Sequence, residues 1–279
     1  HRLAAGAVRG TRTPIVRSVY DGDPPRADRD TKALFGASSQ GLIALSERVR
    51  EGIVSRFGVP EERVVVVEGA VCLKRFNPRQ KRLPDLREQS GLDEGDFVVG
   101  IVARMQRHRR FEIFFEALSR ASAQIPHLKI LLVGRGTWMD EVAVKPAARK
   151  ELVGKAIFTG YRRGAEYVAT LKCMDVKVYL TPGSDGSCRA VRESLAMGVP
   201  VLAARRGHLE DLIEDGVNGF HVNDDPEQLA ELLVRLAHDQ GERERLSKTA
   251  YRQAHKRFGL ALQAESVETF YERVLAANG

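Results

Sequence analysis

Cysteine and long apolar runs are both scarce in this chain of 279 residues. The three cysteines, Cys72, Cys173 and Cys188, are odd in number and lie far apart. They fit neither a disulfide framework nor a CxxC metal site, which indicates a reducing compartment. No stretch approaches the ~20 consecutive apolar residues that a membrane-spanning helix needs. The first residues, HRLAAGAVRGTRTP, do not have the pattern of a secretory signal peptide.

Local signatures of metal-dependent and nucleophilic catalysis are missing as well. The seven histidines show no HxxxH or comparable ligand spacing, and no GxSxG element occurs. Asp21-Gly-Asp23 matches a short acidic motif that binds metal and diphosphate, but it is only three residues long and precedes two prolines. A plain turn explains it better. We therefore expect no bound metal.

Positive charge is in excess, because 44 basic residues face 37 acidic ones, a net charge of +7. Arginine dominates, with 33 Arg against 11 Lys. Its guanidinium suits paired hydrogen bonds to phosphate, although arginine excess is also common in GC-rich genomes. The charge favours phosphorylated ligands, anionic membrane surfaces or nucleic acid. Because the arginines are spread along the chain, without a zinc-finger or RNP-type pattern, we expect no nucleic-acid partner.

Strands and helices alternate along most of the chain. Three strands are expected in the first part, at 13–20, 41–45 and 63–69, and a linker rich in Pro, Arg, Asp and Gly at 77–95. Residues 96–222 repeat strand then helix more regularly, and the chain is helical from Asp225 onwards. This alternation predicts an α/β protein with parallel sheets. Such sheets bind ligands beyond the carboxyl ends of their strands, at the topological switch point.

The loop after the expected strand 97–103 holds four arginines, Arg104, Arg107, Arg109 and Arg110. It lies where that strand opens into a helix, whose N-terminus offers free N–H groups and partial positive charge. Arginine side chains there would hold a diphosphate. The alternative is a solvated basic loop. Because cations at a helix N-terminus oppose the helix dipole, a bound anion makes better sense of the cluster.

The segment 181–200 is the most informative part of the chain. It follows a strand, turns through Gly183 and Gly186, and enters a helix at Ser187 or Cys188. The free N–H groups of residues 186–189 would then face a cleft.

Two acids in this segment could bind a hydroxyl-rich ligand. Asp185 lies just before the expected helix, and Glu193 follows eight positions later. Carboxylates suit ribose and hexose because each accepts several hydrogen bonds. The alternative is that Asp185 caps the helix and Glu193 pairs with Arg189. Such a pair contributes only ~0.3–0.5 kcal/mol, which is a weak reason to keep both acids.

Gly134-Arg135-Gly136 follows a strand and begins like a dinucleotide-binding fingerprint, but Met139 stands in place of the third glycine. No acidic residue ends the next strand, so an NAD site is not indicated. The glycine pair still allows close backbone approach to a nucleotide base.

Six elements occur in order: VARMQRHRRFEIFFEAL, LLVGRG, FTGY, TPGSDGSCRAVRESLAMGVPVLA, RGHLEDLIEDGVNGFHV and DPEQLAELLVRL. Together they resemble family 4 glycosyltransferases, which are retaining, nucleotide-sugar-dependent enzymes of the GT-B fold. The resemblance is strong over about 96–240 and fainter over 1–76, where SERVREGIVSRFGVPEERVVVVEGAVCLKRF is similar to the end of the family's first domain.

The resemblance implies two Rossmann-like domains with parallel sheets that face a cleft. We expect residues 1–90 to form a partial acceptor-side domain with its linker, and residues 91–260 to form the nucleotide-sugar-binding domain. Residues 261–279 would form a helix that packs back towards the first domain. Because the chain starts with His1 inside an expected helix, we expect the family's first strands to precede it, and this chain alone to transfer sugar poorly.

Position by position, Arg104 and Arg109 match the pair that grips the donor diphosphate, and Asp185 matches the acid that touches the transferred sugar. The resemblance makes these three the catalytic residues. Its donor-binding positions are Gly134 and Tyr161 near the base, the loop Gly186, Ser187, Cys188 and Arg189, and Glu193 at the ribose.

The chain also departs from the family pattern. Asp185 and Arg109 stand where Glu and Lys are usual, Gly186-Ser-Cys replaces Gly-Phe-Gly, and Glu68-Gly-Ala-Val-Cys72 replaces Pro-Asn-Gly-Val-Asp. These differences affect the donor sugar more than the reaction class.

We therefore expect a retaining glycosyltransferase that uses a UDP-, GDP- or ADP-sugar and no cofactor. Its partner would be a glycan or lipid-linked acceptor in cell-surface polysaccharide or lipopolysaccharide synthesis. We expect it in the cytoplasm, where it could touch the inner face of a membrane peripherally. Two alternatives are a sugar-nucleotide epimerase or hydrolase of the same fold, and a non-catalytic homologue that binds nucleotide sugar.

Overall fold

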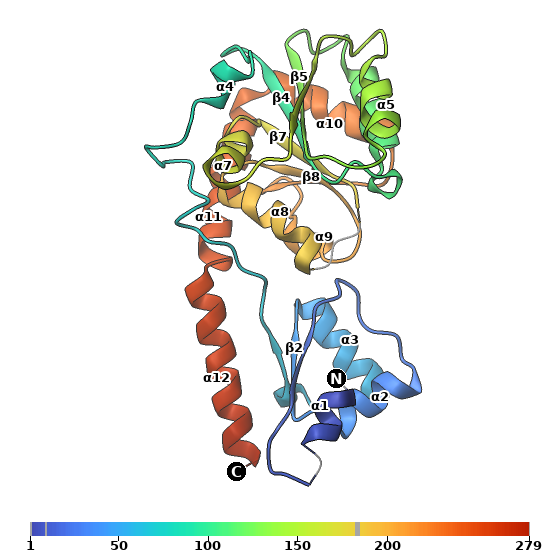
Figure 1. Ribbon diagram of the computed structural model, residues 1–279, viewed down its shortest axis with the longest axis vertical. Helices are drawn as coiled ribbons and strands as arrows, with labels where there is room; N and C mark the ends of the chain where they lie inside the picture. Colours follow the sequence, from blue (N-terminus) through green and yellow to red (C-terminus); the bar gives the residue numbers. More distant parts are fainter. Residues whose placement is uncertain (1, 9, 182–184, 279) are drawn as a thin grey trace.

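The computed structural model describes residues 2–8, 10–181 and 185–278. Two α/β units lie one above the other, and a long C-terminal helix runs back along the smaller unit (Figure 1). The two sheets have three and six strands, and every strand pairing within them is parallel. The predicted α/β class with parallel sheets is therefore confirmed.

The smaller unit is built on three strands in the order β1-β2-β3. Its helices and strands are α1 (Arg2–Ala7), β1 (Val16–Val19), α2 (Arg29–Gly36), β2 (Gly41–Ala44), α3 (Glu47–Phe57), η1 (Glu61–Arg63) and β3 (Val64–Val66). Helix α3 starts at Ser46, whose hydroxyl accepts a hydrogen bond from Val49 N–H. It ends at Gly58, which takes the left-handed conformation that favours glycine. Leu42 and Ile53 pack in the core between the sheet and the helices.

The larger unit carries six strands in the order β6-β5-β4-β7-β8-β9. They are β4 (Phe97–Val102), β5 (Leu128–Val133), β6 (Ala156–Gly160), β7 (Val176–Tyr179), β8 (Val201–Ala204) and β9 (Gly219–Val222). The chain runs outward from β4 through β5 to β6, and returns to the other side of β4 as β7. The switch point therefore lies between β4 and β7, where sheets of this type bind ligands.

Helices cover both faces of the larger sheet. They are α5 (Phe111–Ala121), α7 (Gly164–Lys172), α8 (Asp185–Ala196), α9 (Leu209–Leu212), α10 (Pro226–His238) and α11 (Gln240–Arg257). Val99 and Leu132 point to the face under α5 and α10, whereas Val98 and Leu131 point to the face under α7 and α8. Burial of both faces explains the continuous apolar runs of these strands.

Two segments differ from the sequence expectation. The expected linker, 77–95, contains a short helix, α4 (Leu86–Gln89), and Leu92 is buried in the core of the larger unit. The helix expected within 137–152 is a π-helical turn, η3 (Asp140–Val144), followed by the single turn α6 (Lys145–Ala147). Pro146 has no N–H to donate to the preceding turn, which disturbs a regular α-helix there.

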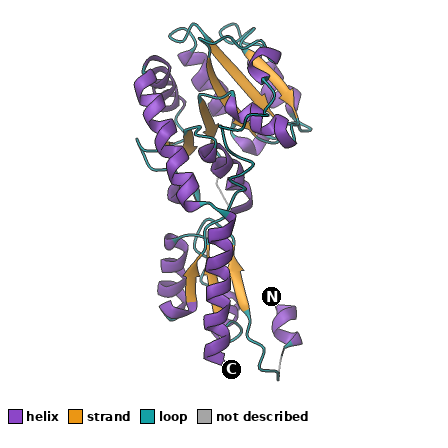
Figure 2. Ribbon diagram, turned by 90° about the vertical axis from the view of Figure 1, so that its left-hand side faces the viewer, coloured by secondary structure: helices purple, strands orange, loops and turns teal. Residues whose placement is uncertain are grey.

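The last helix, α12 (Leu260–Asn278), leaves the larger unit and lies over the three-stranded sheet (Figure 2). Phe270 and Val274 are buried there with Ile43 and Val67. Gly41 makes room for this contact, because a Cβ atom at that position would lie 2.8 Å from the Phe270 ring. None of the described helices is both long and apolar enough to cross a membrane.

Candidate functional site

A cavity of about 870 Å³ lies beside the switch point of the larger sheet. The ends of β4 and β5, the loop after β6, helices α7 and α8, and the segment 70–76 between the two units form its wall. Its lining residues are Ala70, Val71, Cys72, Arg75, Phe76, Val102, Ala103, Arg104, Val133, Gly134, Arg135, Tyr161, Arg162, Arg163, Tyr167, Arg189, Ala190, Glu193 and Leu260. The cavity therefore occupies the place that the topology predicts for a ligand.

The charge of this cavity is strongly positive. Among the lining residues, one carboxylate, Glu193, is set against six arginines: Arg75, Arg104, Arg135, Arg162, Arg163 and Arg189. The ring of Tyr161 is exposed at the rim, and the guanidinium carbons of two of these arginines lie 5.3 and 4.9 Å from its centroid. Such an imbalance suits a ligand that carries several negative charges, such as a diphosphate.

The structure brings together several residues singled out from the sequence. Arg104, Gly134, Tyr161, Arg189 and Glu193 all line this cavity, although they come from four separate segments of the chain. They meet because the carboxyl ends of parallel strands lie at one edge of a sheet.

Two of the four arginines in the loop after β4 are engaged by other side chains. The prediction that all four are available for a diphosphate is therefore corrected. Arg107 forms a two-bond ion pair with Glu141, at 2.8 and 2.7 Å, and stacks on Trp138 at 3.7 Å. Arg110 donates hydrogen bonds to Glu112 and Asp224. These two arginines therefore serve the structure of the loop.

Arg104 and Arg109 differ from those two. Arg104 is exposed on the cavity wall. Arg109 lies in the short turn η2 (Arg107–Arg109), is half-buried, and does not line this cavity. Its Nε atom is buried and has no hydrogen-bond partner in the described part of the chain. An unsatisfied buried donor is costly, so this N–H group is suited to donate a hydrogen bond to an anion.

Helix α8 begins at Asp185, two residues before the expected start. The N–H groups of its first turn are therefore those of residues 185–188. The side chains of Asp185, Gly186 and Ser187 lie outside the described part, and their roles remain predictions. Cys188 is fully buried in the core and does not line the cavity, so only its backbone could reach a ligand.

Glu193 is held by two neighbours. Its side chain is 9% exposed, and Oε2 accepts a hydrogen bond of 2.8 Å from the Tyr167 hydroxyl. Oε1 lies 3.5 Å from Arg189 Nε, which agrees with the helical pair considered from the sequence. Glu193 therefore pairs with Arg189 and also lines the cavity. Pairing within the helix and binding of a ligand are compatible roles for this side chain.

The two glycines after β5 are required by close packing of the backbone. Gly134 has a φ of 139°, and a Cβ atom there would lie 2.0 Å from the Ala103 carbonyl oxygen. At Gly136 it would lie 2.4 Å from the Met105 carbonyl oxygen. The pair is thus needed for packing against the loop after β4, and Gly134 also lines the cavity.

The sequence reasoning missed several lining residues. Arg162 and Arg163 follow one residue after the end of β6, so the carboxyl-end rule could have found them. Arg75 and Tyr167 gave no such signal, because they reach the cavity only through the path of the 70–76 segment and the placement of α7. Lys177 does not line the cavity, and its burial under α8 was not predicted from the sequence either.

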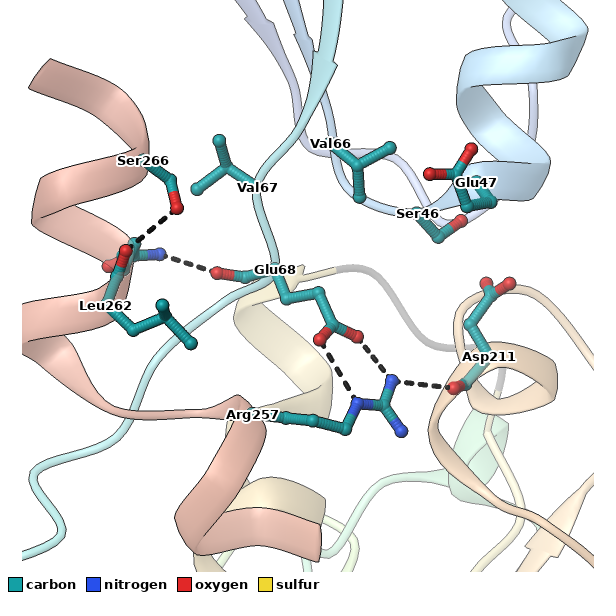
Figure 3. Close-up of a pocket in the computed structure, with 10 residues that line it drawn as sticks. Ser46, Glu47, Val66, Val67, Glu68, Asp211, Arg257, Leu262 and Ser266 are labelled. Carbon is teal, nitrogen blue, oxygen red and sulfur yellow. Dashed lines mark hydrogen bonds and ion pairs between the residues drawn. The ribbon is translucent and has the colours of Figure 1, made fainter. Parts of the chain in front are cut away.

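A second cavity, of about 480 Å³, lies between the two units (Figure 3). It is lined by Ser46, Glu47, Val66, Val67, Glu68, Asp211, Arg257, Leu262, Gln263 and Ser266. Arg257 joins the units, because its guanidinium binds the Glu68 carboxylate and the Asp211 carbonyl oxygen (Figure 3).

Metal-binding groups are not gathered anywhere in the described part: no cluster of three or more His, Cys, Asp or Glu side chains occurs there. The acidic Asp21-Gly-Asp23 motif lies in a bend, and Asp23 forms an ion pair of 3.0 Å with Arg48. This geometry agrees with a turn, and the absence of a metal at this motif stays a prediction.

Solved structures of glycosyltransferases have the same overall fold. Anabaena Alr3699/HepE in complex with UDP has a TM-score of 0.82 at 22% identity, over 97% of this chain and 75% of that one. A glycosyltransferase from Rickettsia africae has a TM-score of 0.83 at 18% identity, over 98% and 73%. The predicted GT-B fold is confirmed.

The chain belongs to the family "Glycosyl transferases group 1", whose model matches residues 84–253. It is similar to spore coat protein SA of Bacillus subtilis, with 25% identity over 83% of this chain and 64% of that protein. A GDP-mannose-dependent alpha-mannosyltransferase of Corynebacterium glutamicum is 33% identical over 53% of this chain and 32% of that protein. The chain thus spans 64% and 32% of the length of these two relatives.

Proposed function

We propose that this chain forms the donor-binding part of a glycosyltransferase, which moves a sugar from a nucleotide diphosphate sugar to an acceptor. One observation carries the proposal: the buried carboxylate of Glu193 faces the same cavity as six arginines. A nucleotide sugar offers the complement of both, because its hydroxyls donate to a carboxylate and its phosphates accept from guanidinium groups. No cluster of metal-binding side chains occurs in the described residues. The sequence after β5 does not carry the full dinucleotide-binding fingerprint either.

The residues have distinct parts in this proposal. Arg104 holds the diphosphate from the cavity wall, together with the N–H groups of the first turn of α8. Arg109 lies outside the lining, and in this proposal its side chain turns its unpaired Nε–H towards the same phosphates. Glu193 accepts hydrogen bonds from the ribose. The base lies near Gly134 and Tyr161, and Asp185 touches the sugar that is transferred.

Charge development explains how such a site promotes transfer. When the bond between the sugar and the diphosphate breaks, negative charge grows on the departing phosphate. Preorganised arginines stabilise that charge more in the transition state than in the ground state, which lowers the barrier. No cofactor is needed for this step. We propose retention of the anomeric configuration on the resemblance to family 4, with the leaving phosphate taking the acceptor proton.

The cavity between the units is proposed as the acceptor side. Its carboxylates, Glu47, Glu68 and Asp211, and its hydroxyls, Ser46 and Ser266, suit the hydroxyl groups of a glycan or a glycolipid headgroup. We place the reaction in the cytoplasm, in the synthesis of a cell-surface polysaccharide or lipopolysaccharide. The positive net charge supports peripheral contact with an anionic membrane.

The test uses the protein at its natural length with UDP-, GDP- and ADP-sugars labelled in the sugar. Each donor is incubated with glycan and lipid-linked acceptors, and the products are separated. Label in the acceptor supports the proposal, and NMR of the new linkage reports whether configuration is retained. Label found only in an epimer or in free sugar contradicts glycosyl transfer.

A further inference from the structure

Tyr167 and Glu193 are joined across 26 residues of sequence. Tyr167, on helix α7, donates its hydroxyl proton to Glu193 Oε2 over 2.8 Å. Its ring packs edge-on against the ring of Phe76, with centroids 6.0 Å apart and planes at 81°. Phe76 is itself 3% exposed. The direction of the Tyr167 hydroxyl is therefore fixed by the contact of its ring with Phe76 and by its hydrogen bond to Glu193.

The other neighbour of Glu193 is held loosely. Arg189 Nε lies 3.5 Å from Oε1, and the arginine side chain is 71% exposed. A pair whose arginine is largely exposed and whose N···O distance is 3.5 Å is weak, and the arginine changes partners easily. Without the bond from Tyr167, the glutamate could turn either oxygen towards Arg189, and the cavity would lose a fixed acceptor.

We propose that Tyr167 is a positioning residue that holds the Glu193 carboxylate for the ribose hydroxyls and so makes the cavity select ribonucleotides. The inference rests on the proposed donor site and adds a residue to it. A carboxylate has about four acceptor positions. Tyr167 uses one of them on Oε2, and the remaining ones stay open to the 2′- and 3′-hydroxyl groups. Burial, and next the charge of Glu193, hold the pKa of the Tyr167 hydroxyl well above its usual value. The hydroxyl therefore stays a donor at neutral pH.

The test compares ligands with and without the hydroxyls that Glu193 would bind. Calorimetry measures the affinity of UDP and GDP, and of their 2′,3′-dideoxy counterparts, for four proteins: the parent, Tyr167→Phe, Glu193→Ala and the double variant. Tyr271→Phe removes a hydroxyl from the exposed face of α12 and is the matched control. Thermal unfolding of each variant confirms that it folds.

We expect Tyr167→Phe to weaken the better-binding ribonucleotide about five- to tenfold, the cost of ordering one long side chain. The dideoxy nucleotide should change less than about twofold, and the double variant should bind no more weakly than Glu193→Ala. Equal weakening of both ligands by Tyr167→Phe would overturn the inference, since it indicates a general packing defect. So would an unchanged ribonucleotide affinity. If UDP, GDP and ADP, titrated in the same way, all fail to bind the parent protein, the proposed function fails together with the inference. Nucleotide binding without the expected ribose selectivity contradicts the inference alone.

Discussion

Lys177 Nζ donates a hydrogen bond of 3.0 Å to Ser194 Oγ, which joins the middle of the six-stranded sheet to helix α8. The lysine side chain is fully buried. Burial lowers the pKa of its ammonium group from 10.5 to about 7, although the charges of Glu193 and Cys188 act in the opposite direction. Helix α8 therefore packs on a buried cation that can lose its charge near neutral pH.

This burial predicts a pH-dependent stability. Between about pH 7 and 10.5 the unfolded chain keeps a proton on Lys177 that the folded chain releases, so the free energy of unfolding should rise with pH. Below about pH 7 both states are charged, and the folded state carries the full desolvation cost, a few kcal/mol. Lys177→Met removes this cost at every pH.

Denaturant unfolding from about pH 6 to about pH 9 measures the effect. The stability advantage of Lys177→Met over the parent should shrink by a few kcal/mol across that range. Lys172→Met alters an exposed lysine at the end of α7 and should keep the parent's dependence. An unchanged difference between the parent and Lys177→Met would show that the buried lysine does not titrate there.

Arg104 and Arg107 should differ sharply when replaced by alanine. Arg104→Ala should weaken UDP or GDP binding by about 1.5–3 kcal/mol, the range for hydrogen bonds to a charged group. Arg107→Ala should leave that affinity nearly unchanged, because its guanidinium is taken up by Glu141 and Trp138. Calorimetric titration measures both. Similar losses in the two variants would mean that the loop binds phosphate as a whole.

Glu193 and Asp185 should separate binding from turnover. Glu193→Ala should weaken donor and free nucleotide alike, by about 1.5–3 kcal/mol, and raise KM. Asp185→Ala should keep nucleotide affinity but lower kcat, because the reacting sugar is misplaced. Asp185→Asn, which keeps the shape and removes the charge, is the sharper probe and should do the same. If Asp185→Ala loses affinity as badly as Glu193→Ala while kcat holds, Asp185 acts as a helix cap instead.

Nucleotide binding should not require a divalent cation. The arginines and the α8 N-terminus supply the positive charge that a metal ion would otherwise bring to a diphosphate. Thermal shift with UDP and GDP, each with and without EDTA, measures this. A shift that disappears on chelation and returns with Mg²⁺ would refute the prediction.

The contact between Arg257 and Glu68 should couple the two units. Glu68→Gln keeps the shape but removes the charge, and we expect a loss of about 1 kcal/mol because both side chains are partly exposed. Calorimetry should then show broader or separated unfolding of the units. Glu61→Gln, which breaks an exposed pair with Arg50 inside the smaller unit, is the control. A single sharp transition in Glu68→Gln would contradict the coupling role.

The sequence by itself determined the parallel α/β architecture. Runs such as RVVVVEG and KILLVG, with a helix after each strand, can be buried only in a sheet covered on both faces. Local patterns singled out Arg104, Gly134, Arg189 and Glu193, and the resemblance to family 4 glycosyltransferases added Tyr161. The structure has all five on one cavity at the carboxyl ends of the strands. These features depend on local patterns and on a general property of parallel sheets.

The tertiary structure alone decided which of these side chains are free to bind. Arg107 is taken by Glu141, 34 residues away, and Glu193 is held by Tyr167 from another helix. Lys177, in an apolar strand, lies under α8 with its ammonium group on Ser194. Such contacts join residues distant in sequence, and their geometry follows from how helices pack on the sheet. Sequence periodicity records which face of an element is buried, but not which side chain of another element meets it there.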